Sequence, residues 1–262
     1  MKTLFLSLVL AVVLSQSASA SNFATQVTDA TFKLFHPDST STCFLLQCEK
    51  PEPQYCLVTT AHTLERTKGD TTTLVLRKPT ENGGYERLDL AIPIRDKGES
   101  LWVRHPTQDV AVLRLSRPLP VPVSALPVAW LADDDRLNKS GVHICSPLFV
   151  LTYPERFEAS ASGFPVARLG IFSSPPLLPS QQHPTFLADF TTFSGDSGGP
   201  VFIANENDET PLVVGIVLGR HFHDEQIHAE YEDRHIRHPL GLGIVLHARY
   251  VHDTIDLAID SR

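Results

Sequence analysis

Positive charge and long apolar runs are both scarce in this sequence of 262 residues. There are 22 Lys and Arg against 30 Asp and Glu, giving a formal net charge of −8. Affinity for phosphate backbones comes mainly from clustered Lys and Arg, so we expect no nucleic-acid partner. After residue 14, no apolar run approaches the roughly 20 residues that a membrane-spanning helix needs. We therefore expect a globular protein without a membrane partner once its N-terminal segment is removed.

Cysteine is limited to four residues, Cys43, Cys48, Cys56 and Cys145. Their spacing lacks the paired short intervals of a structural zinc site, and we expect no bound metal. Four cysteines allow three disulfide connectivities, and spacing does not choose among them. A Cys48–Cys56 bridge would close a loop between two predicted strands. Cys43 and Cys145 would then form the remaining pair.

The N-terminus has the pattern of a secretory signal peptide. A short segment with Lys2 precedes an apolar run from Leu4 to Leu14, and Ala18-Ser19-Ala20 matches the small-residue cleavage pattern. We expect residues 1–20 to be removed after Ala20 and the mature protein to be secreted or periplasmic. The alternative is a buried N-terminal helix.

Short runs of Val, Leu, Ile, Thr and Phe recur along the chain and are broken by Pro, Gly, Asn and Asp. This pattern, with 20 prolines, favours an all-β protein. A proline-spaced stretch near the middle predicts an extended connector, and apolar residues at a spacing of four predict a terminal helix. The predicted parts are a β-domain at 21–116, a connector at 117–139, a β-domain at 140–248 and a helix at 249–262.

Three segments contain residue types that suit nucleophilic catalysis. Leu57–Thr63 is an apolar strand ending in Ala-His, Gln108–Leu115 begins with an Asp before a strand, and Gly195–Pro200 reads Gly-Asp-Ser-Gly-Gly-Pro. Alone, the His and the Asp are more often a polar strand end and a turn residue. The glycine segment is more informative, because glycines around a serine allow backbone N–H groups to converge on one point.

Together these segments resemble the trypsin/chymotrypsin-like serine peptidases, whose three motifs occur in the same chain order. The resemblance covers nearly the whole mature chain and implies two six-stranded antiparallel β-barrels with the active site between them. It also implies a serine endopeptidase that hydrolyses peptide bonds through an acyl-enzyme. The expected substrate is a protein or peptide; we expect no cofactor and a monomeric enzyme.

The resemblance assigns the catalytic roles to His62, Asp109 and Ser197. Ser197 would be the nucleophile, His62 its general base, and Asp109 the group that orients His62. The backbone N–H groups of Gly195 and Ser197 would form the oxyanion hole.

The chain departs from animal-type members of this family at its mature N-terminus. Ser21-Asn22-Phe23-Ala24 lacks the Ile-Val-Gly-Gly start whose amine pairs with the acid before the catalytic Ser. Asp196 must therefore find another partner or be solvated. In this the chain is similar to bacterial and HtrA-type peptidases, without the PDZ domain that HtrA proteins append.

The primary specificity position, six residues before the catalytic Ser in this family, is Thr191. With Thr192, it would provide a neutral pocket that prefers small, apolar or polar uncharged side chains over Arg or Lys. Leu218 and Gly219 would belong to the strand beside the bound substrate, where Leu218-Gly219-Arg220 replaces the usual Ser-Trp-Gly.

Histidine is concentrated near the C-terminus, where seven of the 12 follow residue 220. Acidic residues are interleaved with them, which predicts a solvated insertion loop over 221–238 rather than a metal site. Such a loop would border the primary pocket.

Two other classes of function compete with a peptidase. One is a catalytically silent homologue that binds peptides or partners, which usually lacks a triad residue. The other is a His-rich, metal-binding secreted protein, which leaves the glycine-rich serine segment unexplained.

Overall fold

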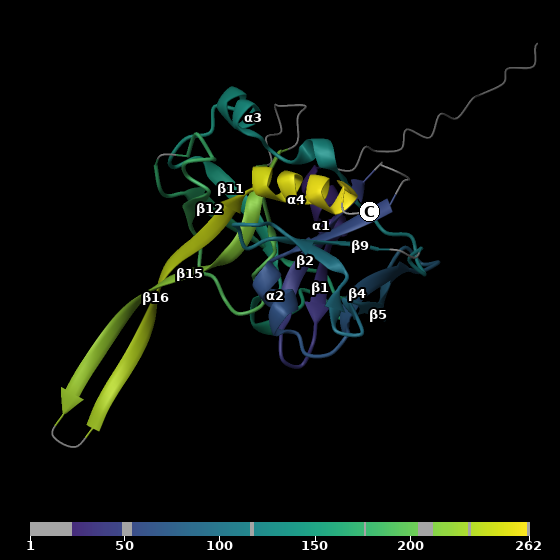
Figure 1. The fold of residues 1–262 in the computed structure, drawn as a ribbon, viewed down its shortest axis with the longest axis horizontal. Helices are drawn as coiled ribbons and strands as arrows, with labels where there is room; N and C mark the ends of the chain where they lie inside the picture. The colour runs from purple at the N-terminus through teal and green to yellow at the C-terminus, as the bar shows by residue number, and fades with distance from the viewer. Residues whose placement is uncertain are drawn as a thin grey trace, which may run out of the picture.

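The computed structural model describes residues 23–48, 54–115, 118–175, 177–203, 212–229 and 232–260. The predicted signal peptide and its cleavage site lie outside these residues. Most of the described chain is β-structure, with a helix at its C-terminal end, as expected (Figure 1). None of the described helices combines the length and apolar character needed to span a bilayer.

The N-terminal half is built on an open sheet. Its elements are α1 (Phe23–Ala30), β1 (Thr31–Phe35), β2 (Thr40–Cys48), β3 (Gln54–Thr59), α2 (Ala61–Arg66), β4 (Thr71–Pro79), β5 (Tyr85–Pro93), β6 (Arg95–Asp96), β7 (Glu99–Ser100), β8 (Trp102–Arg104) and β9 (Ala111–Arg114). The strand order is β5-β4-β1-β2-β3-β9-β8, and an eighth strand, β10 (Leu126–Pro127), pairs in parallel with β2. β6 and β7 pair separately.

The expected first six-stranded barrel is therefore wrong. Within the described residues, β5 and β8 end the sheet and do not pair with each other. β5 is largely exposed and includes Glu86, Arg87 and Asp89. Charged side chains on an edge strand disfavour further strand pairing, which explains why the sheet remains open.

The C-terminal half contains the expected six-stranded closed barrel, ordered β11-β12-β13-β16-β15-β14. It is preceded by η1 (Val128–Trp130) and α3 (Asp134–Lys139), within the stretch predicted as a connector. The elements from there to the C-terminus are β11 (Pro147–Thr152), η2 (Pro154–Arg156), β12 (Val166–Phe172), β13 (Thr185–Asp189), β14 (Pro200–Ile203), β15 (Leu212–Ala229), β16 (Glu232–His247) and α4 (Ala248–Asp260).

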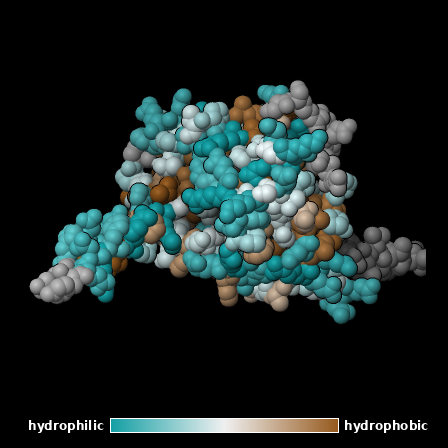
Figure 2. Space-filling model, turned by 60° about the horizontal axis from the view of Figure 1, so that its bottom comes forward, coloured by the Kyte–Doolittle hydropathy of each residue, from teal (hydrophilic) through white to brown (hydrophobic). Residues whose placement is uncertain are grey.

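The distal parts of β15 and β16 form a two-stranded arm that projects away from the body (Figure 1). Its register runs from Phe222 opposite Pro239 to Ala229 opposite Glu232. The predicted loop at 221–238 is therefore wrong, because its described residues continue the two barrel strands as an antiparallel ribbon. The surface of the arm is mostly hydrophilic (Figure 2), and charged residues support such a ribbon through cross-strand pairs.

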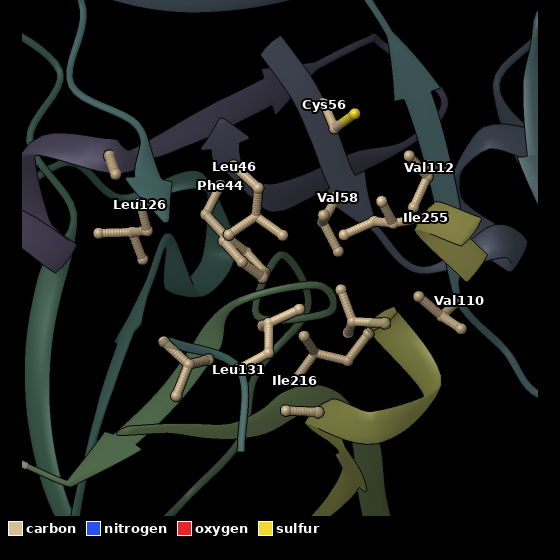
Figure 3. Close-up of a cluster of buried hydrophobic side chains, with 14 of the residues drawn as sticks. Phe44, Leu46, Cys56, Val58, Val110, Val112, Leu126, Leu131, Ile216 and Ile255 are labelled. Atoms are coloured by element: carbon tan, nitrogen blue, oxygen red, sulfur yellow. The ribbon is translucent and has the colours of Figure 1, made fainter. Parts of the chain in front are cut away.

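Helix α4 closes a hydrophobic core that both halves share. Val251 and Ile255 of α4 pack in one cluster with Val112 of β9 and Ile216 of β15 (Figure 3). All four side chains are almost fully buried. Because burying one such side chain contributes about 1.5–3 kcal/mol, the cluster holds the sheet and the barrel together.

The cysteines follow the sequence expectation only in part. Cys48 and Cys56 form a disulfide between paired strands β2 and β3. Cys43 and Cys145 are both free, so the expected second bridge is wrong. Cys43 is buried within the N-terminal core, whereas Cys145 is exposed just before the barrel begins. The two thiols thus belong to different environments in different halves.

Candidate active site

The paired strands β3 and β9 bring His62 and Asp109 together. Thr59 lies opposite Ala111 in this register, so the residues just beyond each strand end are neighbours. His62 is the second residue of α2, and its backbone N–H donates to Asp109 Oδ1 at 2.9 Å. Its ring Nδ1 lies 2.5 Å from Asp109 Oδ2. Two contacts therefore fix the carboxylate against the imidazole.

The environment of Asp109 keeps its carboxyl group ionised. Partial burial alone would raise its pKa, but hydrogen bonds from the His62 ring and backbone, with the charges of His62 and Arg104, lower it below the ordinary value. An ionised Asp109 accepts a hydrogen bond from a protonated Nδ1 of His62. In the neutral imidazole, Nε2 then carries no proton and is the acceptor. The pair therefore presents a base at Nε2.

Glycine is required at two positions of the segment that carries Ser197. Gly195 and Gly198 have φ values of 98° and 85°. A Cβ atom at Gly195 would lie 2.3 Å from Tyr153 O, and one at Gly198 would lie 2.2 Å from Thr42 O. Only glycine tolerates both the left-handed backbone and this close approach. The spacing of glycines in the sequence thus reflects a tightly enclosed loop.

The N-terminal sheet contributes directly to the conformation of this loop. Thr42 of β2 donates from its backbone N–H to Ser197 O at 2.9 Å and from its hydroxyl to Gly195 O at 2.9 Å. The backbone N–H groups of Gly195 and Ser197 make no hydrogen bond with any residue in the described part of the chain. The carbonyls are therefore anchored while these two amides remain unpaired.

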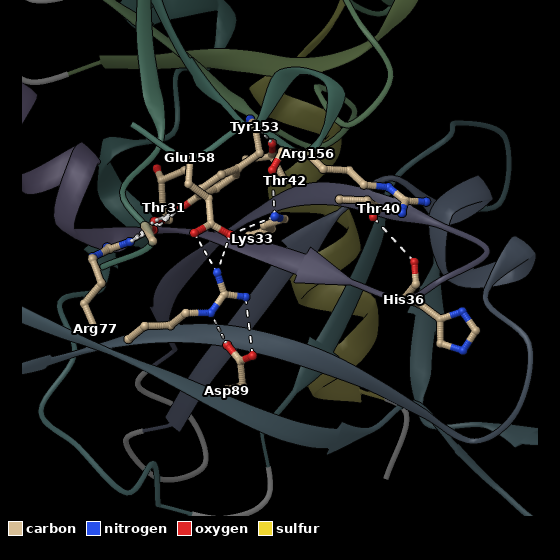
Figure 4. Close-up of polar contacts among 12 residues, drawn as sticks. Thr31, Lys33, His36, Thr40, Thr42, Arg77, Asp89, Tyr153, Arg156 and Glu158 are labelled. Carbon is tan, nitrogen blue, oxygen red and sulfur yellow. Dashed lines mark hydrogen bonds and ion pairs between the residues drawn. The ribbon is translucent and has the colours of Figure 1, made fainter. Parts of the chain in front are cut away.

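A polar cluster between the two halves supports the loop from the other side. Lys33 of β1 donates to Glu158 Oε1 and to Arg156 O, each at 2.7 Å (Figure 4). In the same segment, Glu155 donates its backbone N–H to Ser194 O at 2.6 Å and accepts from the Ser194 N–H at 3.1 Å. The segment around η2 thus connects the N-terminal sheet to the residue before Gly195.

The hydroxyl of Ser197 is directed to a backbone carbonyl. It donates to Leu218 O of β15 at 3.1 Å, and within the described residues it makes no hydrogen bond with His62. Gly198 N–H donates to Val217 O at 2.8 Å, which aligns the loop with β15. The structure thus unites His62 with Asp109 and Ser197 with Leu218, but shows no direct bond between the two pairs.

Asp196 has a partner that sequence reasoning missed. Its Oδ2 accepts from Arg168 Nη2 at 2.6 Å and from the Phe193 N–H at 2.7 Å. Burial raises the pKa of Asp196, although Arg168, the Phe193 N–H and Thr152 act in the opposite direction. Arg168 lies on β12, 28 residues away in sequence, so no local motif points to it. The acid before the serine is therefore held by an internal arginine.

The predicted specificity residues lie around the same loop. Thr191 is exposed and its carbonyl accepts from Arg168, whereas Thr192 is buried and its carbonyl accepts from Arg220 Nη1 at 2.6 Å. In the described part of the chain, the Thr192 hydroxyl has no hydrogen-bond partner. Gly219 lies opposite Ile244 of β16. Arg220 was not among the predicted specificity residues.

The histidines of the arm interact with its acids. His228 Nδ1 lies 2.8 Å from Asp233 Oδ1, and His238 Nε2 lies 2.8 Å from Glu225 Oε2. Among the described residues, there is no group of three or more His, Cys, Asp or Glu side chains placed to hold a metal ion.

Comparison with known proteins identifies a fold rather than a family. No protein-family model and no curated protein sequence matches the chain. The chain is similar to a solved structure of Rv3671c from M. tuberculosis H37Rv, an inactive form of a serine-to-alanine mutant, at 16% identity and a TM-score of 0.52; the match covers 90% of this chain and 89% of that one. A second structure, described as Rv3671c protease in an inactive form, matches at 18% identity and a TM-score of 0.49, covering 90% and 92%. The first comparison shows that the chain shares the fold of a solved protein across most of its length.

Proposed function

We propose that the protein is a serine endopeptidase that uses Ser197, His62 and Asp109. The His62–Asp109 contact carries the proposal, because it provides an oriented base beside a glycine-rich serine loop. The shared fold agrees with this function, since the first Rv3671c structure is described as a serine-to-alanine mutant in an inactive form. The proposed substrates are proteins or peptides.

Catalysis would begin when the Ser197 hydroxyl breaks its hydrogen bond to Leu218 O and donates one to His62 Nε2 instead. His62 takes the hydroxyl proton while Ser197 Oγ forms a bond to the substrate carbonyl carbon. The protonated ring, stabilised by ionised Asp109, then gives that proton to the leaving amine as the peptide bond breaks. A water molecule hydrolyses the acyl-enzyme by the same route and regenerates the serine.

The unpaired amides of Gly195 and Ser197 support an oxyanion hole at this loop. Negative charge develops on the substrate carbonyl oxygen during attack, and two fixed N–H donors stabilise it without reorganisation. The carbonyls of the same two peptide units, Ser194 O and Asp196 O, accept hydrogen bonds from the backbone N–H groups of Glu155 and Gly199. Loss of one such donor typically costs about 2.7–4 kcal/mol of transition-state stabilisation.

A catalytically silent peptide-binding homologue is the second candidate. The observation that favours it is the Ser197–Leu218 hydrogen bond, which leaves the nucleophile apart from its base. In that case the site would bind a peptide without cleaving it. The two candidates differ in whether the Ser197 hydroxyl becomes nucleophilic in the folded protein.

Labelling with a fluorophosphonate probe tests the choice. We expect covalent labelling of the wild-type protein and none of Ser197→Ala or His62→Ala, with thermal melting used to confirm that both variants fold. Labelling that persists in Ser197→Ala would assign the reaction to another residue. A folded wild-type protein that neither reacts nor cleaves any peptide would favour the silent homologue.

We further propose that the mature protein is a secreted or periplasmic monomer. The Cys48–Cys56 disulfide supports export, because such bonds persist in oxidising compartments. N-terminal sequencing of the exported protein should begin at Ser21, and light scattering should give the monomer mass. A mature protein that retains Met1 would contradict the export proposal.

A further inference from the structure

Arg220 places a cation beside the serine loop without a carboxylate partner. Its Nη1 donates to Thr192 O at 2.6 Å, and its guanidinium lies 5.0 Å from the centre of the Phe222 ring. Across the described residues, no Asp or Glu forms an ion pair with it. The side chain is half-buried. The remaining guanidinium N–H groups are therefore available to an incoming acceptor.

The position of this cation relates it directly to the nucleophile. Arg220 follows Leu218, whose carbonyl accepts from Ser197 Oγ, by two residues on β15. Its partner Thr192 precedes Ser197 by five residues on the loop that leads to the nucleophile. The Arg220 side chain thus joins the two segments that flank Ser197. Because Arg220 lies only two residues from Leu218 on an extended strand, a side chain next to a scissile bond held at Ser197 Oγ would come within reach of its guanidinium.

Nearby acids do not neutralise this charge. Asp196 is already paired with Arg168. Asp189 ends β13 with an exposed side chain, opposite Leu242 of β16. Within the described residues the region therefore has a cation without a counterion, which suits a carboxylate.

We propose that Arg220 is a specificity-determining residue that selects Glu or Asp immediately N-terminal to the scissile bond. This inference rests on the proposed peptidase function and replaces the neutral preference that Thr191 suggested. The guanidinium would donate a charge-assisted hydrogen bond to the substrate carboxylate. A hydrogen bond to a charged group favours its substrate over a neutral isostere by about ten- to hundredfold.

Matched fluorogenic peptides that differ only at this substrate residue provide the test. For the wild-type protein, kcat/KM with Glu should exceed that with Gln by at least about tenfold. Arg220→Gln should bring this ratio close to one, and Arg220→Lys should retain part of it. The control is Arg237→Gln. Arg237 also packs on the Phe222 ring, with its guanidinium 4.1 Å from the ring centre, but it is paired with Asp224, so its replacement should leave the ratio unchanged.

Fluorophosphonate labelling separates failure of this inference from failure of the proposed function. Labelled wild-type protein with equal rates on Glu and Gln peptides, or with a dominant cut after apolar residues, overturns the role of Arg220 alone. Absence of labelling overturns the peptidase function itself. If Arg220→Gln does not fold, the test is made on the wild-type protein, by comparing the ratio of kcat/KM for the Glu and Gln peptides at low and at high salt. A ratio that falls as salt rises supports the ion pair, and an invariant ratio contradicts it.

Discussion

The two halves of the molecule position their functional residues by different means. In the open N-terminal sheet, His62 and Asp109 meet because they lie just beyond the paired ends of two adjacent strands, β3 and β9. In the closed C-terminal barrel, the Ser197 loop is held by tertiary contacts from β2, β12 and the η2 segment. The first arrangement depends on the pairing of two adjacent strands, whereas the second depends on side-chain and backbone contacts from several separate elements. Substitutions in the two halves should therefore differ in whether they change chemistry or stability.

The largest expected effect is on chemistry in the N-terminal half. Asp109→Asn should reduce kcat by about 10⁴-fold, because an amide no longer selects the tautomer with a free Nε2. The thermal midpoint should change little, since the β3–β9 pairing that places the residue is unaffected. Steady-state kinetics with parallel melting curves checks both. A variant that loses stability as strongly as activity would show that this half is not positioned by strand pairing alone.

In the barrel half, the corresponding substitution should mainly affect stability. Arg168→Gln leaves the carboxylate of buried Asp196 without its cation, and loss of one partner of a buried pair costs about 3–5 kcal/mol. Urea unfolding measures this change. The double variant with Asp196→Asn should recover much of the lost stability, because it removes the uncompensated charge. If the double variant recovers none of the lost stability, a buried ion pair is not what supports the loop.

Acid should destabilise the barrel through His247. Burial lowers the pKa of this side chain to about 4, outweighing the opposite effects of Asp134 and of the Leu177 backbone. The unfolded state has the ordinary pKa near 6.5 and binds the proton first, so this contribution is complete above about pH 6.5 and is lost as pH falls towards 4. The loss amounts to about 3 kcal/mol, from 1.36 kcal/mol per unit of pKa difference.

His247→Phe tests this contribution through the pH dependence of unfolding. The difference between wild-type and variant free energies should shrink or reverse between pH 6.5 and 4. The lowered pKa of Asp109 has a separate effect, because its stabilising contribution persists until pH falls through its folded-state value. Parallel curves for wild type and His247→Phe would rule out a titrating histidine in the barrel.

Sequence reasoning succeeded where function depends on adjacent residues. The glycines around Ser197 could be recognised because their positive φ values and close contacts demand glycine. The C-terminal helix followed from the spacing of Val251 and Ile255. Sequence reasoning failed where no motif marks one of the two partners: Asp196 lies in the glycine-rich segment, but nothing in the sequence around Arg168 identifies it as the partner. The open sheet and the arm were also missed, since strand order and strand continuation depend on tertiary pairing.

The disulfide of the N-terminal half should have a moderate effect on stability. Replacing Cys48 and Cys56 together with Ser removes a bond that spans eight residues. The chain-entropy relation gives a cost of about 2–3 kcal/mol for so short a loop. Chemical unfolding of the double variant measures it, and peptidase activity of the folded fraction should remain. Loss of activity without loss of stability would indicate that the bond also positions the site.

The smallest effect should come from the free thiol of the barrel half. Cys145 is exposed and has a φ of 71°, a conformation that Ser would share, so Cys145→Ser should change stability by at most about 0.5 kcal/mol. Cys43 lies in the N-terminal core, where burial raises the pKa of its thiol. A maleimide reagent should therefore modify Cys145 in the native protein and reach Cys43 only after unfolding. Native protein with no reactive thiol, restored to reactivity by reduction, would instead mean that Cys43 and Cys145 are bonded and that the halves are covalently joined.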